Sequence, residues 1–284
     1  MFKKIFFAAA LLLASLLNAK PVVIASIAPV EYLAKAVGGD KIEVQSLAKG
    51  DVHSYEPKPN DMKAVAKARI FIAAGLEFEE AWIPRFKASA KNLVVVKSDA
   101  KIAKLKEERG EQAEHDEKHE AHADPHVWLN PMLAITMARN ISDALIDMDK
   151  ANKDFYLENF QKLMNDLLAF DESAKNELAG LKNRKFVVYH PAWGYFAAHY
   201  DLEQISIERS GKEPKIDEMA STLKMIKDEN IKVIFADPNR SQKSAQILAS
   251  QTGAKVELLD PLGYNLLENL KIAVGAIKDA NSPK

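Results

Sequence analysis

The stretch NKDFYLENFQKLMNDLLAFDESAKNELAG, from Asn152 to Gly180, lies between two halves of the chain in which short β-rich runs alternate with helical stretches. Its apolar residues recur at spacings of 4, 3, 4, 3, 4 and 4, namely at Tyr156, Phe160, Leu163, Leu167, Phe170, Ala174 and Leu178. This period predicts an amphipathic helix packed against protein. The helix would be roughly 40 Å long at 1.5 Å per residue and would end at Gly180. Such a helix can brace two lobes along their whole height, although an ordinary long helix within one domain is the alternative.

The helix belongs to a longer segment, 132–179, that contains neither glycine nor proline. Asp149 to Asn152 is a plausible break within it. On either side, short β-rich runs alternate with helical stretches, and Asn60 is a candidate cap for one of these helices. The expected strands are 21–26, 43–47, 70–73 and 93–96 in the first half, and 186–189, 203–207, 233–235 and 256–259 in the second.

This alternation predicts an α/β protein. We expect two (β/α) lobes with parallel sheets, joined by one long rigid backbone helix, with a site at the cleft between the lobes. The expected division is a signal peptide at 1–19, an N-terminal lobe at 20–150 that includes a histidine-rich acidic loop at 107–124, a linking helix at 151–181, and a C-terminal lobe at 182–284.

The amino-acid composition limits the partners and the metal ligands that can be expected. The 284 residues are 48% hydrophobic, enough for a substantial core, and the formal net charge of −1 gives no reason to expect nucleic acid or an anionic membrane as a partner. There is no cysteine, so disulfides, thiolate ligands and a lipid-modified cysteine are excluded. Any metal must be held by histidine, carboxylates, backbone or water.

The first residues are typical of an export signal. Lys3 and Lys4 precede the apolar run 6–17, and Ala19 follows as a small residue suited to cleavage. An uncleaved anchor is the alternative. We therefore expect a periplasmic protein that is cleaved near Ala19.

Three histidines lie at or beyond the ends of strand-like runs in widely separated segments: His53, His126 and His190. Asp260 closes a fourth run. Ligands of open parallel sheets bind beyond the carboxyl ends of the strands, so these residues can converge between two lobes. Neutral imidazoles and a carboxylate are the ligand set of a tetrahedral zinc site. A single such histidine is more often a hydrogen-bonding residue, the role we assign to His199.

Two further groups surround the predicted site. Four aromatic side chains are expected to form an apolar wall around it: Trp128, Trp193, Tyr195 and Tyr264. The histidine-rich acidic loop carries His115, His119 and His122, and we interpret it as a secondary, weaker metal-binding segment, with an ordinary solvated loop as the alternative.

A secreted zinc hydrolase is the rival class, because catalytic zinc often has three histidine ligands and a water. The chain lacks His-Glu-x-x-His, and the segment His119 to His122 is one residue short of it. Asp260 would also occupy the position that the catalytic water needs. We therefore expect no enzyme activity.

Several phrases of the chain resemble one family, the extracytoplasmic zinc-binding proteins of ABC-type metal importers (the cluster A-I metal-binding class), over essentially the whole mature chain. They are HSYEP at 53–57, GLEFE at 75–79, DPHVWL at 124–129, HPAWGYF at 190–196, GKEP at 211–214 and LDPLG at 259–263.

The resemblance implies two lobes joined by a rigid helix and metal-ligand roles for His53, His126, His190 and Asp260. In some members water or a carboxylate near the first histidine completes the shell, which leaves Glu56 and Glu77 as rivals of Asp260. It implies a monomeric receptor that captures Zn²⁺, closes only slightly and docks on a membrane permease. Manganese members resemble the chain except for a carboxylate in place of His190, so manganese or iron is the alternative cargo.

Overall fold

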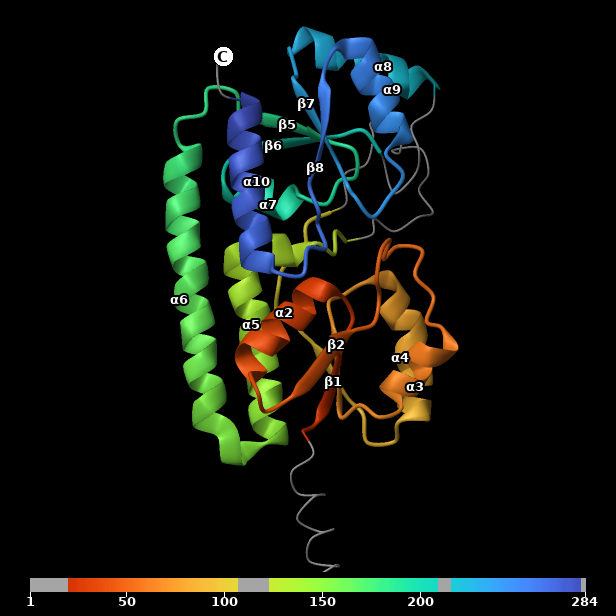
Figure 1. Cartoon of the computed structure of the whole chain (residues 1–284), viewed down its shortest axis with the longest axis vertical. Helices are drawn as coiled ribbons and strands as arrows, with labels where there is room; N and C mark the ends of the chain where they lie inside the picture. The colour runs from red at the N-terminus through yellow and green to blue at the C-terminus, as the bar shows by residue number, and fades with distance from the viewer. Residues whose placement is uncertain (1–19, 107–122, 209–215, 282–284) are drawn as a thin grey trace, which may run out of the picture.

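The computed structural model describes residues 20–106, 123–208 and 216–281. Two α/β lobes lie one above the other, and a single helix, α6 (Lys153–Leu178), runs alongside both of them (Figure 1). The predicted class, two α/β lobes with parallel sheets joined by a long helix, is confirmed.

The first lobe is built on a parallel sheet in the order β2-β1-β3-β4. Its strands are β1 (Val22–Ala25), β2 (Glu43–Ser46), β3 (Ile70–Ala73) and β4 (Val94–Lys97). All four residues of β3 are buried, as its continuous apolar sequence indicates. β4 has an equally apolar sequence but is an edge strand, so Val94 remains 54% exposed.

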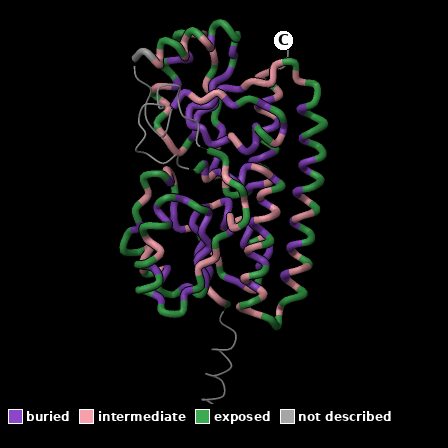
Figure 2. The backbone as a smooth tube through the Cα atoms, turned by 180° about the vertical axis from the view of Figure 1, so that it is seen from behind, coloured by how far each residue is buried: buried purple, intermediate pink, exposed green. Residues whose placement is uncertain are grey.

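The second lobe repeats this topology with the order β6-β5-β7-β8, again all parallel. Its strands are β5 (Lys185–Val188), β6 (Glu203–Ser206), β7 (Val233–Ala236) and β8 (Lys255–Leu258). β7 is buried along its length, whereas Leu258 on the edge strand β8 is 52% exposed. The buried backbone in both lobes is concentrated in the strands and in the helix faces that cover them (Figure 2).

The remaining helices cover the sheets. They are α2 (Ala28–Gly38), α3 (Pro59–Val65), α4 (Glu77–Ser89), α5 (Pro131–Met148), α7 (Gly194–His199), α8 (Ile216–Asp228), α9 (Lys243–Thr252) and α10 (Leu266–Asn281), with 3-10 turns η2 (Val127–Leu129) and η3 (Lys150–Asn152). The prediction that Asn60 caps a helix was wrong. α3 already begins at Pro59, and the backbone N–H of Lys58 is bound by the Asp61 carboxylate, which leaves Asn60 in the first turn.

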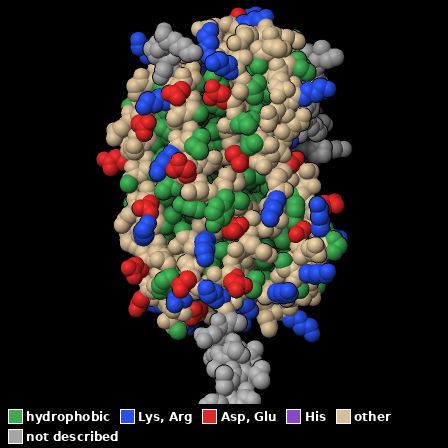
Figure 3. Space-filling model, viewed as in Figure 1, with side chains coloured by type: hydrophobic (Ala, Val, Ile, Leu, Met, Phe, Trp, Pro, Cys, Tyr) green, Lys and Arg blue, Asp and Glu red, His purple; other side chains and the backbone are tan. Residues whose placement is uncertain are grey.

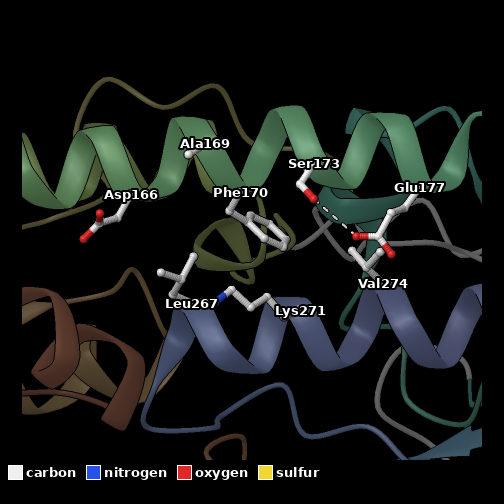
Figure 4. Close-up of a pocket in the computed structure, with 8 residues that line it drawn as sticks. All are labelled: Asp166, Ala169, Phe170, Ser173, Glu177, Leu267, Lys271 and Val274. Carbon is white, nitrogen blue, oxygen red and sulfur yellow. Dashed lines mark hydrogen bonds between the residues drawn. The ribbon is translucent and has the colours of Figure 1, made fainter.

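α6 has the predicted length and buried face. Its 26 residues span roughly 39 Å, and the break before it falls at η3. The residues of its predicted apolar stripe are between 0% and 6% exposed, namely Tyr156, Phe160, Leu163, Leu167, Phe170, Ala174 and Leu178. α6 packs on α5 and α2 in the first lobe and on α10 near the second (Figure 4). The Nε2 atom of His199 also lies 2.6 Å from Oδ1 of Asp171, which ties α7 to α6.

The surface carries both signs of charge. On the face seen in Figure 3, acidic and basic side chains are interspersed, consistent with the formal net charge of −1. No helix within the described ranges has both the length and the apolar character that a bilayer crossing requires.

Candidate metal centre

The structure brings His53, His126 and His190 together. One ring nitrogen from each lies within 4.8 Å of the others, and no other group of three or more potential ligands occurs in 20–106, 123–208 and 216–281. The Nε2 atoms of His53 and His190 are 3.2 Å apart. The ring centroid of His126 lies 5.6 Å from that of His53 and 5.3 Å from that of His190. His53 follows a strand of the first lobe and His190 follows a strand of the second lobe, so the cluster lies between the two lobes.

His126 is positioned by the start of α5. Asn130 caps this helix by accepting the N–H groups of Met132 and Leu133, and η2 connects the cap to His126. Asp124 Oδ1 lies 2.9 Å from the backbone nitrogen of His126 and 2.8 Å from its Nδ1. A carboxylate that accepts the Nδ1 proton leaves the Nε2 lone pair free for a metal ion.

His190 follows β5, where the backbone continues the sheet through the Tyr189 N–H, which donates to Phe235 O. The ring is buried, and its Nδ1 lies 2.8 Å from Oε2 of Glu208, which follows β6. Arg240 also reaches this group, because its Nη2 donates to Glu208 Oε1 at 2.7 Å. His190 is thus held from behind by a buried ion pair.

His53 occupies the loop between β2 and α3 and is the exposed member of the group. Gly50 permits the turn into this loop with a φ of +83°, a conformation that side-chain-bearing residues rarely adopt. The His53 N–H then donates to Asp51 Oδ1 at 3.1 Å. The ring packs edge-on against His190, with centroids 4.9 Å apart, so its opposite edge faces outward.

The electrostatic environment favours the neutral form of His53 and of His190. Partial desolvation of the His53 ring, followed by the neighbouring His190 and His126, lowers its pKa to about 4. Burial is also the main reason that the pKa of His190 lies well below its usual value, with His126 and Arg240 adding to the effect. Neutral imidazoles have a lone pair to offer, so both side chains can act as metal ligands at neutral pH.

Asp260 does not belong to this group in the structure. It follows β8, and its Oδ1 accepts hydrogen bonds from Asn239 Nδ2 and the Leu262 N–H, both at 2.8 Å. Its role as fourth ligand therefore stays a prediction. The rivals Glu56 and Glu77 are exposed and are also outside the group. Three imidazoles would leave one position of a tetrahedral shell for a carboxylate or water.

The predicted aromatic wall is only partly present. The ring centroid of Trp128 lies 5.3 Å from that of His126, and its Nε1–H donates to Pro261 O in the second lobe at 2.8 Å. Trp193 and Tyr195 are also buried. The inclusion of Tyr264 was wrong, because this residue is 46% exposed and packs edge-on against Tyr32.

A small cavity of about 230 Å³ adjoins His126 and His190. Tyr195 borders this region: its hydroxyl accepts the Leu105 N–H and donates to Asp124 O, each at 2.8 Å. Lys106, just before the histidine-rich acidic loop, forms an antiparallel bridge with Ala123, near the end of that loop, beside the cavity. His115, His119 and His122, like the predicted signal peptide at 1–19, lie outside the described residues.

A second hollow lies far from the histidines. A groove of about 460 Å³ runs between α6 and α10, where Phe170, Leu267 and Val274 form an apolar floor and charged residues form the rim (Figure 4). None of the residues that line it is a histidine.

The sequence interpretation missed three residues that support the ligands: Asp124, Glu208 and Arg240. The first had a local signal, because Asp-Pro-His places a carboxylate two residues before a histidine. Glu208 is 18 residues from His190 and Arg240 is 50 residues from it, and only the parallel order β6-β5-β7 brings them behind the ring.

The fold and the site together define a metal-binding protein of two α/β lobes that are braced by one helix and meet at a three-histidine cluster. The family model described as zinc-uptake complex component A, periplasmic (ZnuA), matches residues 23–280, and the chain belongs to this family.

Relatives agree with this assignment. The high-affinity zinc uptake system protein ZnuA of Bacillus subtilis is 30% identical over 279 residues, covering 91% of this chain and 86% of that protein. A putative metal-binding protein of Treponema pallidum is 34% identical over 243 residues, covering 82% of this chain and 77% of the relative. A crystal structure of ZnuA superposes with a TM-score of 0.87 at 34% identity, covering 93% of this chain and all 100% of that one.

Proposed function

We propose that this protein is a periplasmic receptor that captures Zn²⁺ as its cargo and delivers it to the membrane permease of an ABC-type importer. The observation that carries the proposal is the meeting of three imidazoles, drawn from both lobes, with one ring nitrogen each within 4.8 Å of the others. Membership of the zinc-uptake family supports the same conclusion.

The donor set favours zinc over the alternative cargo, manganese or iron. Imidazole nitrogen suits zinc, whereas manganese prefers a shell with more oxygen ligands. His190 is a nitrogen donor, and the carboxylate behind it, Glu208, faces Nδ1 rather than the centre of the cluster. A manganese site would need additional oxygen donors at the centre, and the described residues include none in the group.

A receptor also fits better than a zinc hydrolase. Hydrolysis needs a general base beside a metal-bound water. The two buried carboxylates near the cluster, Asp124 and Glu208, are each bound to the Nδ1 atom of a histidine. They orient ligands and are not placed to accept a proton from water, so we propose binding and release without catalysis.

Several further features belong to this proposal. Asp260 is the proposed fourth ligand, which it becomes by exchanging Asn239 for the metal ion. His115, His119 and His122 are a proposed weaker site. We further propose that the mature protein begins after Ala19 and acts as a monomer, with lobes at 20–150 and 182–284 joined by the helix at 151–181.

The direct test is a chelator-competed titration of the demetallated mature protein with zinc, with manganese measured in parallel. We expect one tight equivalent of zinc and much weaker binding of manganese. Tighter binding of manganese would reassign the cargo. A lack of tight binding by either ion would contradict the proposal.

A further inference from the structure

Arg240 contacts both His190, a proposed metal ligand, and Glu208, the carboxylate beside the His190 ring. Its Nη1 lies 2.8 Å from Nδ1 of His190, and its Nη2 donates to Glu208 Oε1 at 2.7 Å. Oε2 of Glu208 lies 2.8 Å from the same Nδ1. All three side chains are largely withdrawn from solvent, with exposures of 17% for Arg240, 5% for His190 and 4% for Glu208.

The two contacts of His190 Nδ1 require opposite protonation states of this atom. A guanidinium can only donate hydrogen bonds, and an ionised carboxylate can only accept them. A neutral imidazole carries a single proton on one of its two nitrogens. His190 Nδ1 therefore either donates to Glu208 or accepts from Arg240, and it cannot do both at once.

The position of the proton on His190 also determines the hydrogen bond between His190 Nε2 and His53. The Nε2 atoms of His53 and His190 lie 3.2 Å apart, so a hydrogen bond between them needs a proton on one of the two. In one arrangement, Arg240 donates to His190 Nδ1, and His190 Nε2–H donates to His53. In the other, His53 Nε2–H donates to His190, and His190 Nδ1–H donates to Glu208.

Zinc is compatible with only one form of His190. A metal ion at the cluster needs the lone pair of His190 Nε2, which requires the proton on Nδ1 and its acceptance by Glu208. Arg240 stabilises the opposite form, in which Nε2 carries the proton. Arg240 also places its positive charge beside His190, a proposed ligand of the positively charged zinc ion.

We propose that Arg240 is a positioning residue that competes with zinc for His190 and thereby keeps the bound ion releasable. In the metal-free protein, Arg240 holds a substantial share of His190 with Nε2 protonated. On loading, the proton of His190 is held on Nδ1, where it donates a hydrogen bond to Glu208, and Nη1 of Arg240 gives up its contact. The inference rests on the proposed three-histidine zinc site and adds the residue that limits its affinity.

The position of Arg240 gives it a second connection to the site. Its backbone N–H donates to Asp237 O, in the turn that follows β7. In the same turn, the Asn239 side chain donates to Asp260 Oδ1 at 2.8 Å. Two consecutive residues thus engage both groups that the second lobe is proposed to offer to the metal. Loading would release His190 from Arg240 and Asp260 from Asn239 through one movement of this turn.

The test compares Arg240→Met with the wild-type protein. Because the variant removes both the competing donor and the charge, we expect zinc binding to tighten by roughly tenfold, the lower end of the range seen when groups behind metal ligands are changed. Zinc dissociation should slow by a similar factor. Arg240→Lys, which keeps the charge without the planar fork, should fall between the two.

Arg184→Met is the matched control in the same lobe. Arg184 donates to the backbone carbonyls of Leu178 and Tyr200 and contacts none of the three histidines, so its loss should leave zinc affinity unchanged. Circular dichroism and thermal unfolding check that each variant folds.

An independent readout uses the metal-free protein. Protonated and unprotonated imidazole nitrogens have well separated ¹⁵N chemical shifts, and comparison with His190→Gln assigns the signals. We expect His190 to show protonated Nε2 in the wild type and to shift toward protonated Nδ1 in Arg240→Met. If the folded variant binds zinc more weakly or equally, or if wild-type His190 is protonated on Nδ1 alone, the inference is overturned. A wild-type protein that binds no zinc would instead refute the proposed function.

Discussion

The Nε2 atoms of His53 and His190 lie 3.2 Å apart, although the two residues come from different lobes. Two nitrogens bound to one tetrahedral zinc ion at ≈ 2.0–2.1 Å would be separated by about 3.4 Å. The spacing of these two nitrogens is therefore close to the one that the ion requires. Because α6 runs along both lobes, the change on loading should be small and confined to the loops that carry the ligands.

Removal of one cluster histidine should abolish tight binding. His126→Ala deletes a buried ligand, and we expect zinc affinity to fall by about 100-fold or more, roughly 3 kcal/mol. His199→Ala is the control, since His199 bonds to Asp171 on α6 and takes no part in the cluster. Chelator competition measures both. Equal losses of affinity in the two variants would contradict the assignment.

Asp260→Ala tests the fourth ligand. If Asp260 leaves Asn239 to complete the shell, its removal should weaken zinc binding by at least tenfold, about 1.4 kcal/mol. Glu56→Ala provides the comparison, because Glu56 is the rival carboxylate closest in sequence to His53 and is exposed. Should the loss appear in Glu56→Ala and not in Asp260→Ala, the assignment passes to Glu56.

The pH dependence of zinc binding should be shallow above about pH 5. Three ordinary histidines, with a pKa near 6.5, would each release close to one proton on binding at pH 5.5. The pKa of His53 is lowered to about 4 and that of His190 also lies well below its usual value, so at pH 5.5 each ring holds less of a proton than an ordinary histidine does. We expect the logarithm of the zinc Kd to change by no more than about one unit per pH unit between pH 7.5 and 5.5. A slope of two or three would show that the rings are not desolvated.

The lowered pKa of His53 also determines how the stability of the metal-free protein changes with pH. The pKa of His53 is lower in the folded protein than in the unfolded chain, so below about pH 6.5 the unfolded chain binds more protons. Stability is therefore retained above pH 6.5 and falls as the pH drops from 6.5 toward 4. Urea unfolding at several pH values checks this, and His53→Ala should reduce the loss. A metal-free protein that gained stability over this range would contradict it.

Trp128 should matter for the contact between the lobes. It is fully buried, and its Nε1–H donates to Pro261 O in the second lobe. Trp128→Phe removes this hydrogen bond and part of the packed volume, so we expect a loss of about 1–2 kcal/mol in the free energy of unfolding, with weaker zinc binding. Trp82→Phe is the control, because Trp82 packs on Arg85 within α4. A larger effect at Trp82 would count against an interlobe role for Trp128.

The sequence predicted the elements better than the arrangement of polar groups. The strands were recognisable because buried parallel strands such as Ile70–Ala73 are continuously apolar, and α6 was recognisable from its period. Apolar sequence did not reveal that Val94 lies on an edge strand, because strand order is a property of the assembled sheet. The histidines were found because each carries a local phrase. Glu208 and Arg240 carry none, and their contacts with His190 depend on three neighbouring strands.

The most direct test of the account is X-ray absorption spectroscopy at the zinc edge on the mature protein loaded with one equivalent of zinc. We expect three imidazole nitrogens at ≈ 2.0–2.1 Å and one oxygen in a four-coordinate shell, with one imidazole lost in His126→Ala. A shell with fewer than three imidazoles, or one unchanged in His126→Ala, would show that the three histidines do not hold the ion together.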